Sequence, residues 1–334
     1  MISSRRWLAL VGIVVVLAVL CLVSIAVGAR SMPLGHVLDA LFTPDRAPDD
    51  ELAIVRGLRV PRTVLGLLTG ASIGLAGALM QGLTRNPLAD PGLLGVSAGA
   101  SLGIVVAVGV LHVGDFYGYI WFAILGAVLA SALVYVLGGL GHGGATPVKL
   151  ALAGVGVTFF LGSVTSAIVL ASPAALDRFR FWSAGSLAGQ DTGTIWRVAP
   201  FLVVGIVVAL CSAPALNTLA LGDRMARALG RRVGLVRVTG AVAVTLLAAA
   251  SVAVTGPIVF VGLVVPHLVR LITGPDYRLL LPFTLLLSPA LLLAADVLGR
   301  VVVRPGEMQV GVIVAFIGAP FFIALVRRRS VAEL

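Results

Sequence analysis

The sequence predicts an all-α polytopic membrane protein with about ten transmembrane helices and both termini in the cytoplasm. Of its 334 residues 59% are hydrophobic and only 11% are charged, whereas a soluble domain carries about 25% charged residues. The apolar residues form continuous runs that approach the roughly 20 residues a helix needs to cross a bilayer. Membrane β-barrels have short alternating segments instead, so these runs indicate helices in lipid.

Ten apolar runs divide the chain and form one transmembrane domain over residues 1–334. The first run exceeds the roughly 7–15 apolar residues of a signal peptide, so we expect an uncleaved span. The eighth is short, follows Pro257 and contains Pro266, which favours a broken or tilted helix. The runs cover 7–28, 62–81, 93–111, 119–140, 149–171, 195–213, 236–255, 258–272, 279–298 and 310–326.

The loops between the runs set the expected orientation. With the N-terminus inside, 14 of the 24 basic residues lie on the cytoplasmic side and the other 10 lie outside. Positive residues are enriched on the cytoplasmic side of membrane proteins, so both termini are expected inside. The formal charge of +10 is carried by these loops, which indicates contact with membrane lipid and no nucleic-acid partner.

The sequence lacks the residue patterns of an ATPase, a metalloenzyme or an ion-coupled transporter. Its only lysine, Lys149, precedes Leu150, so no Gly-x-x-x-x-Gly-Lys-Ser/Thr phosphate loop exists. No pair of acids and no Ser/His pair indicates a catalytic site. Asp296 is the only acid within an apolar run, and Arg300 follows four residues later. We therefore expect no catalytic residue, no metal site and no cofactor bound by this chain.

Two adjacent runs carry glycines spaced four residues apart. Such glycines make a flat helix face that lets neighbouring backbones come close. Packing of membrane helices is sufficient to explain each glycine, and two triplets in succession favour a central place for these helices. The predicted packing residues are Gly66, Gly70, Gly74, Gly95, Gly99 and Gly103.

A family resemblance rests on motifs that extend over most of the chain. Arg59-Val60-Pro61-Arg62 is followed at the end of the second run by Asn86-Pro87-Leu88-Ala89-Asp90-Pro91. Further matching elements are Trp182 to Ser186, Phe260 to His267, Leu293 to Asp296 and Gly311 to Pro320. With these motifs the chain resembles the FecCD-type permease family of ABC importers.

This resemblance implies the membrane-spanning permease subunit of a binding-protein-dependent importer in a bacterial inner membrane. Ferric siderophores or another iron chelate are the expected cargo, with vitamin B12 or haem as alternatives. The implied partners are two ATPase subunits that bind ATP and Mg²⁺, a second permease subunit, identical or paralogous, and an extracytoplasmic solute-binding protein. The alternative of another class is a secondary transporter that works without ATP.

The segment 216–232 lies between the sixth and seventh runs. Asp223 is expected to cap a short helix and Gly230 to end it, while Met225, Ala228 and Leu229 share one face. Such a helix fits a groove on another protein, or lies on anionic lipid. The resemblance favours the first reading and implies that the ATPase-coupling residues are Leu219, Leu221, Gly222, Asp223, Ala226, Leu229 and Gly230.

Arginines expected on the outer side run against the usual charge bias. The resemblance implies that Arg59, Arg62 and Arg300 grip acidic residues of the solute-binding protein, and lipid headgroup anchors are the alternative. At the cytoplasmic turn before the fifth run, the vitamin B12 importer has small hydroxyl residues at its inner gate. This chain has Pro147 and Val148 there, so we expect a narrow neck closed by Thr146 and Val148.

Overall fold

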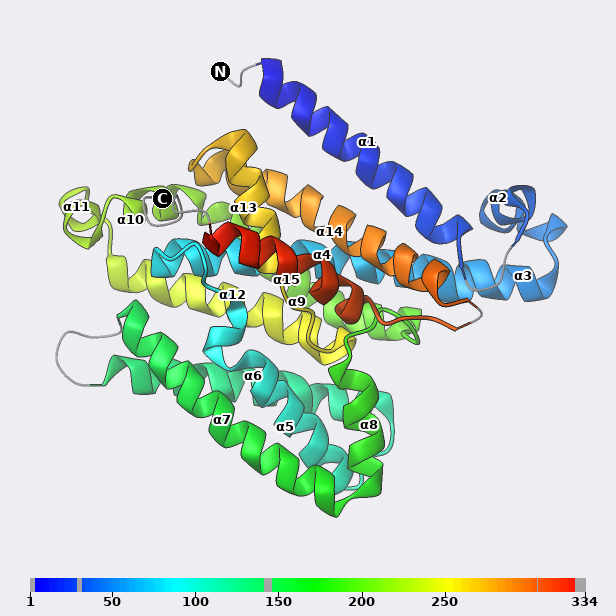
Figure 1. Cartoon of the computed structure of the whole chain (residues 1–334), viewed down its shortest axis with the longest axis horizontal. Coiled ribbons are helices and arrows are strands. Elements are labelled where there is room, and N and C mark those ends of the chain that lie inside the picture. Colours follow the sequence, from blue (N-terminus) through cyan, green and yellow to red (C-terminus); the bar gives the residue numbers. More distant parts are fainter. Residues whose placement is uncertain (1–3, 29–31, 141–145, 305, 328–334) are drawn as a thin grey trace.

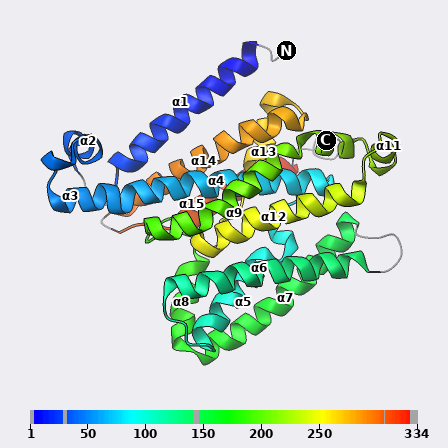
Figure 2. The same ribbon diagram turned by 180° about the vertical axis from the view of Figure 1, so that it is seen from behind.

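The computed structural model describes residues 4–28, 32–140, 146–304 and 306–327, and every regular element within these ranges is helical. Figures 1 and 2 show the helices from opposite sides. In chain order they are α1 (Ser4–Ala26), α2 (Leu34–Phe42), η1 (Pro44–Arg46), α3 (Asp49–Ile54), η2 (Val55–Arg59), α4 (Val60–Thr84), η3 (Pro91–Leu94), α5 (Val96–Gly109), α6 (Phe116–Gly139), α7 (Pro147–Ala171), α8 (Pro173–Ser183), α9 (Thr192–Cys211), α10 (Ala213–Ala220), α11 (Asp223–Ala228), α12 (Val233–Thr255), α13 (Val261–Thr273), α14 (Tyr277–Val302) and α15 (Val310–Arg327).

Each of the ten predicted apolar runs coincides with a helix. Seven helices in the described part are long and apolar enough to cross a bilayer, and α5, α13 and α15 are shorter apolar helices. The second run begins earlier than predicted, because α3, η2 and α4 form one continuous helix over Asp49–Thr84. Pro61 lies just after the π-helical turn η2, and the wider turn gives its ring the room that a regular helix denies it.

The eighth predicted run, 258–272, is broken near its beginning, in agreement with the predicted broken or tilted helix. Gly256 and Phe260 both have left-handed backbone angles, with φ of +72° and +67°, and α13 starts only at Val261. Pro266 lies inside α13 without ending it. The break therefore comes from the loop at 256–260 and not from the internal proline.

The helices form two groups that are visible in Figure 1. Helices α5, α6, α7 and α8 pack on one another, and α4 lies in the other group against α14, α12 and α13. In the Asp49–Thr84 helix 83% of the most apolar stretch is buried, whereas only 11% of the corresponding stretch of α1 is buried. Thus α4 is the central helix of the fold and α1 lies at its periphery, mainly along α14.

The helix ends define two opposite sides of the molecule. The start of α1, the helices α10 and α11, and the end of α15 lie at one side, which we call the α11 end (Figure 1). The helices α2 and α3 lie at the other, which we call the α2 end. Arg6, near the start of α1, acts electrostatically on Asp276 in the turn before α14, which places this turn at the α11 end as well.

The glycines of α4 lie where α14 packs most closely. An added Cβ at Gly66 would meet Leu293, one at Gly70 would meet Pro289, and one at Gly74 would meet Ser288. All three neighbours belong to α14. The absence of side chains thus lets the two backbones approach each other along a single face.

The second predicted glycine triplet divides into two kinds of residue. Gly99 and Gly103 lie against the backbone of α6 at Gly126 and Phe122. Gly95 precedes α5 with a φ of +71°, and the nearest atom to an added Cβ there is 3.5 Å away. The prediction that Gly95 packs on a helix face is therefore wrong, because this glycine provides the left-handed turn from which α5 begins.

A valine at Gly70 should destabilise the fold. Its Cβ would lie 2.5 Å from Cα of Pro289, and α4 is packed on several sides, so the helices must separate. Overpacking of this kind costs about 1–3 kcal/mol, and thermal unfolding in detergent should report it. The control is Gly162→Val in α7, where nothing lies within 4 Å of the added Cβ. Equal melting temperatures of the two variants would contradict the close α4–α14 contact.

Candidate functional site

A buried ion-pair cluster joins α4 and α14 at the α2 end. Asp296 is fully buried, and its carboxylate accepts hydrogen bonds from Arg62 at 2.8 Å and lies 2.7 Å from Arg300. Arg62 also pairs with Glu307 at 2.7 Å. A buried charge is stable only when it is paired and hydrogen-bonded, so two arginines and one aspartate fix these helices against each other.

The same arginines hold the end of α1. Arg300 donates to the carbonyls of Ser24 and Val27 at 2.7 and 2.8 Å, and Arg59 donates to those of Ile25 and Ala26 at 3.0 and 2.7 Å. The last carbonyls of a helix have no partner within the helix. Positive charge near a helix C-terminus is favourable, so this guanidinium cluster binds the otherwise peripheral helix α1 to the bundle.

These arginines also line a cavity of about 450 Å³ at the α2 end, which we call the arginine cavity. The three predicted docking residues are therefore brought together by the fold. Arg59 and Arg300 are only 5% and 1% exposed, however, whereas residues that grip another protein are expected to be exposed. They are buried because the carbonyls of α1 and the carboxylate of Asp296 need donors there. The cavity is lined by Gly28, Ile54, Leu58, Arg59, Arg62, Leu187, Ala188, Gly189, Gln190, Arg300 and Glu307.

The predicted coupling segment folds at the opposite end as two short helices, α10 and α11. Gly222 has a φ of +97° and stands at the N-cap of α11 without a side-chain cap. The prediction that Asp223 caps the helix is thus wrong, because Asp223 is already its first residue. Its carboxylate pairs instead with Arg237 at 2.9 Å and with Arg85 at 3.4 Å. Gly230, with a φ of +78°, follows the end of α11.

One side of this segment is packed and the other is apolar and exposed. Leu219 and Ala226 are buried against the bundle. Leu221, Met225 and Leu229 are 63%, 52% and 57% exposed, and we call these three residues the α11 patch. Contiguous exposed apolar patches mark contact surfaces. The segment therefore has the form of a docking element that the bundle holds from behind.

A side-chain clamp that sequence reasoning missed joins α10 to α14. Asn217 donates from Nδ2 to Asp276 at 2.6 Å, and its Oδ1 accepts from the backbone N–H of Tyr277 at 2.9 Å. Asp276 caps α14 by accepting from the backbone N–H of Arg278. These hydrogen bonds, first that of Arg278 and then that of Asn217, hold the pKa of Asp276 below its usual range. An Asp directly before a helix is a cap signal that can be read from the sequence, but its side-chain partner 59 residues away is not.

The predicted gate residues lie at the start of α7, at the α11 end. Thr146 is the N-cap of α7, and its hydroxyl accepts from the backbone N–H of Lys149 at 3.4 Å. Val148 is 69% exposed. His142 and Ala145 of the same turn lie outside the described residues. The role of Thr146 and Val148 as a gate stays a prediction.

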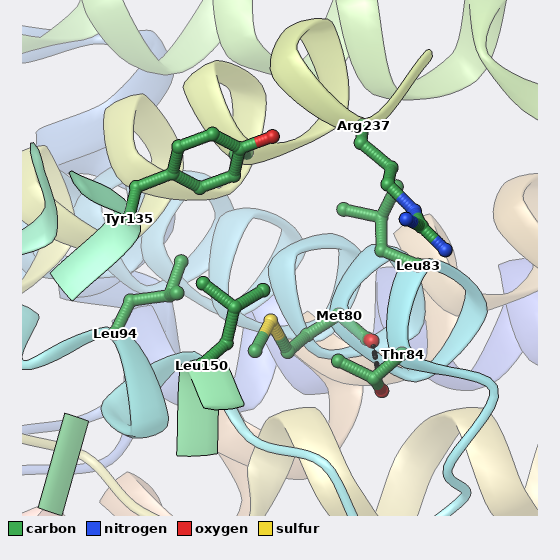
Figure 3. A pocket seen from close by; sticks show the side chains of 8 residues that line it. Met80, Leu83, Thr84, Leu94, Tyr135, Leu150 and Arg237 are labelled. Atoms are coloured by element: carbon green, nitrogen blue, oxygen red, sulfur yellow. Dashed lines mark hydrogen bonds between the residues drawn. The ribbon is translucent and has the colours of Figure 1, made fainter. Parts of the chain in front are cut away.

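A small cavity behind this region lies between α4, α6, α7 and α12 (Figure 3). Its wall includes Met80, Thr84, Tyr135, Leu150 and Arg237, and the Thr84 hydroxyl donates to the Met80 carbonyl at 2.6 Å. Its volume of about 30 Å³ holds on the order of one water molecule. The cavity is therefore no passage for a solute within this chain.

A larger hollow lies on the face formed by α15 and the loops before α9 and α13. It has a volume of about 620 Å³ and includes the small residues Ala184, Gly311, Ala315 and Ala319. Large apolar side chains on α7 and α15 are exposed: Phe159 is 74%, Leu170 86% and Phe316 73% exposed. These helices thus present wide apolar surfaces that the described chain leaves uncovered.

Comparison with known proteins places this geometry in a family. A profile of the FecCD transport family matches residues 16–328. The chain is 45% identical over 330 residues to the ferric enterobactin transport system permease protein FepD of Escherichia coli (strain K12), covering 98% of each chain. It is 41% identical over 326 residues to the Fe(3+)-citrate import system permease protein YfmD of Bacillus subtilis (strain 168), covering 98% of this chain and 96% of that one.

A solved structure shares the fold over nearly the whole chain. It is an inward-facing metal-chelate type ABC transporter, superposes with a TM-score of 0.84 at 27% identity, and covers 96% of this chain and 99% of that one. Both the family profile and these relatives extend across the buried arginine cluster and the α10–α11 segment. This chain therefore belongs to the FecCD transport family.

Proposed function

We propose that this chain is the permease subunit of an ABC importer for a ferric siderophore or another iron chelate. The end-to-end similarity to FepD carries the proposal, because it extends over 98% of both chains. YfmD, named for Fe(3+)-citrate, supports iron as the metal. A relative named for cobalamin import, from Halobacterium salinarum, is 40% identical over 86% of this chain, so vitamin B12 is the competing cargo.

In this proposal the α11 end faces the cytoplasm. Arg85, Arg227, Arg232, Arg237 and Arg270 lie there, in agreement with the usual excess of positive residues inside. A cysteine at the exposed Arg231, in a chain without Cys21 and Cys211, should react with a membrane-impermeant thiol reagent in inside-out vesicles only. Equal labelling of intact cells would contradict this orientation.

The α11 patch is the proposed contact with a separate ATPase pair, which binds ATP and Mg²⁺. Leu221, Met225 and Leu229 offer the apolar anchor of a helix that enters a groove. On the other side of the segment, Asp223 forms ion pairs with Arg85 and Arg237, and these hold the segment on the bundle. Movement of the ATPases would therefore be passed directly to α4 and α12.

The arginine cavity is the proposed contact with the solute-binding protein. Arg59, Arg62 and Arg300 carry three positive charges against the two negative charges of Asp296 and Glu307, so the cavity favours a carboxylate from a docked protein. Charge complementarity of this kind mainly raises the association rate and fixes the orientation.

A second permease subunit is proposed to cover the exposed faces of α7 and α15. The hollow on α15 would then line a passage between two subunits, with Thr146 and Val148 at its inner neck. Its apolar, small-residue wall suits passage of a bulky chelate without tight binding.

Reconstitution tests the proposal. The chain, purified with the ATPase that accompanies it, is placed in proteoliposomes with the solute-binding protein and radiolabelled ferric enterobactin, ferric citrate or cobalamin. We expect ATP-dependent uptake of an iron chelate, and no uptake with a non-hydrolysable ATP analogue. Uptake driven by an ion gradient without ATP would overturn the proposal, and uptake of cobalamin alone would correct the cargo.

A further inference from the structure

The coupling segment is fastened to the bundle at two places. Asn217 of α10 uses both ends of its amide, donating to Asp276 and accepting from the N–H of Tyr277 at the start of α14. Asp223 of α11 pairs with Arg85, just after α4, and with Arg237 in α12. Because an amide bound at both ends cannot rotate freely, α10 has a fixed orientation on the first turn of α14.

The same two helices meet again at the α2 end. Arg62 of α4 and Asp296 of α14 form the buried ion pair there, and Arg300 ties both to the end of α1. All the charged members of this cluster except Asp296 line the arginine cavity. Helix α14 has 26 residues and is about 39 Å long at 1.5 Å per residue. The α4–α14 pair thus reaches from the arginine cavity to the coupling segment.

Helices α4 and α14 pack closely along one face. Gly66, Gly70 and Gly74 bring α4 directly against α14 along most of the contact. Pro282 and Pro289 both lie inside α14, where a proline removes a backbone hydrogen bond and softens a helix. Gly70 packs on the backbone of Pro289, so α4 supports α14 at one of these two positions.

We infer that the α4–α14 pair transmits docking at the arginine cavity to the α11 patch, and that Asn217 is the positioning residue that links α10 to this pair. The inference rests on the proposed function. A rigid pair with one end in the cavity and the other in the clamp changes the placement of α10 whenever the arginine cluster shifts. Loss of the clamp leaves both partners able to bind but no longer coupled.

The test exchanges the two clamp residues. Asn217→Asp places two carboxylates 2.6 Å apart and should break the clamp. Asp276→Asn keeps an acceptor for both Asn217 and the N–H of Arg278, so it should behave like the wild type. The double variant Asn217→Asp with Asp276→Asn reverses donor and acceptor, so the amide at position 276 can donate to the carboxylate at position 217. The cap bond from the N–H of Arg278 is lost in exchange, because one oxygen of Asp276 accepts both hydrogen bonds. Basal ATP hydrolysis, its stimulation by the solute-binding protein, and binding of that protein are measured on each reconstituted complex.

For Asn217→Asp we expect unchanged basal hydrolysis and docking affinity, with stimulation reduced about five- to tenfold, as for loss of an ordinary coupling interaction. The double variant should recover part of the stimulation, because it restores the bond between α10 and the start of α14 but not the cap bond of Arg278. Full stimulation in Asn217→Asp, or no recovery in the double variant, would overturn the inference. If Asn217→Asp does not accumulate, Asn217→Ala removes both hydrogen bonds without repulsion. Its stimulated ATP hydrolysis is then compared with its basal hydrolysis in the same way. A wild-type complex without any stimulation would instead defeat the proposed function, and the inference with it.

Discussion

Replacing Asp296 by alanine is expected to cost about 3–5 kcal/mol of folding free energy, the cost of breaking a buried ion pair by removing one partner. Its side chain is 0% exposed, and the substitution leaves Arg62 and Arg300, 11% and 2% exposed, without their shared carboxylate. Thermal unfolding in detergent measures the loss. Protease accessibility of the segment after α1 should rise at the same time, because Arg300 also holds Ser24 and Val27.

The matched control is Glu307→Gln. Glu307 pairs with the same Arg62, but its side chain is 34% exposed, and partly solvated pairs contribute only about 0–1 kcal/mol. Each variant thus removes one carboxylate partner of Arg62, and the two partners differ in that Asp296 is buried and Glu307 is partly exposed. Equal destabilisation by both would show that burial does not govern this cluster.

Replacing Asp223 by arginine should abolish transport while the protein still inserts. The new guanidinium would stand beside Arg85 and Arg237, which Asp223 now pairs. It would also place positive charge in the first turn of α11, where the helix dipole disfavours it. Since α11 lies outside the candidate spans, the amount of protein in the membrane should stay the same. Uptake and stimulated ATP hydrolysis in proteoliposomes should fall by at least about tenfold, a typical allosteric coupling loss.

A charge exchange separates this effect from general damage. Asp223→Arg combined with Arg237→Asp restores one opposite-charge pair between α11 and α12 and should recover part of the uptake. Arg224→Gln, a change in an exposed residue of the same helix, is the control and should leave uptake unchanged. Uptake at the wild-type level in Asp223→Arg would remove the α11 segment from the proposed coupling route.

Helix positions were predictable because each apolar run must satisfy its own backbone hydrogen bonds in lipid. Boundaries failed where local geometry intervenes. The π-turn at 55–59 joins α3 to α4, and the left-handed Gly95 delays the start of α5. Such turns depend on one or two residues, so the periodicity of the run does not reveal them.

In the candidate site too, the local sequence pattern predicted some features, whereas others depend on tertiary contacts. The sequence grouped residues 216–232 into one segment with a short amphipathic helix, and it marked Arg59, Arg62 and Arg300 as charges that need a reason. It could not show that Arg59 and Arg300 turn inward to the carbonyls of α1. That choice depends on where the end of α1 packs, which no residue near Arg59 encodes.

The sequence by itself determined that this protein is a helical membrane body and which segments carry its charged and amphipathic motifs, because lipid imposes length and polarity on every span. Only the tertiary structure decided that Asp296 joins Arg62 across 234 residues and that Asn217 clamps the start of α14. Partners so far apart in the chain meet through the packing of α4 on α14, and that packing is set by the shape of both helices together.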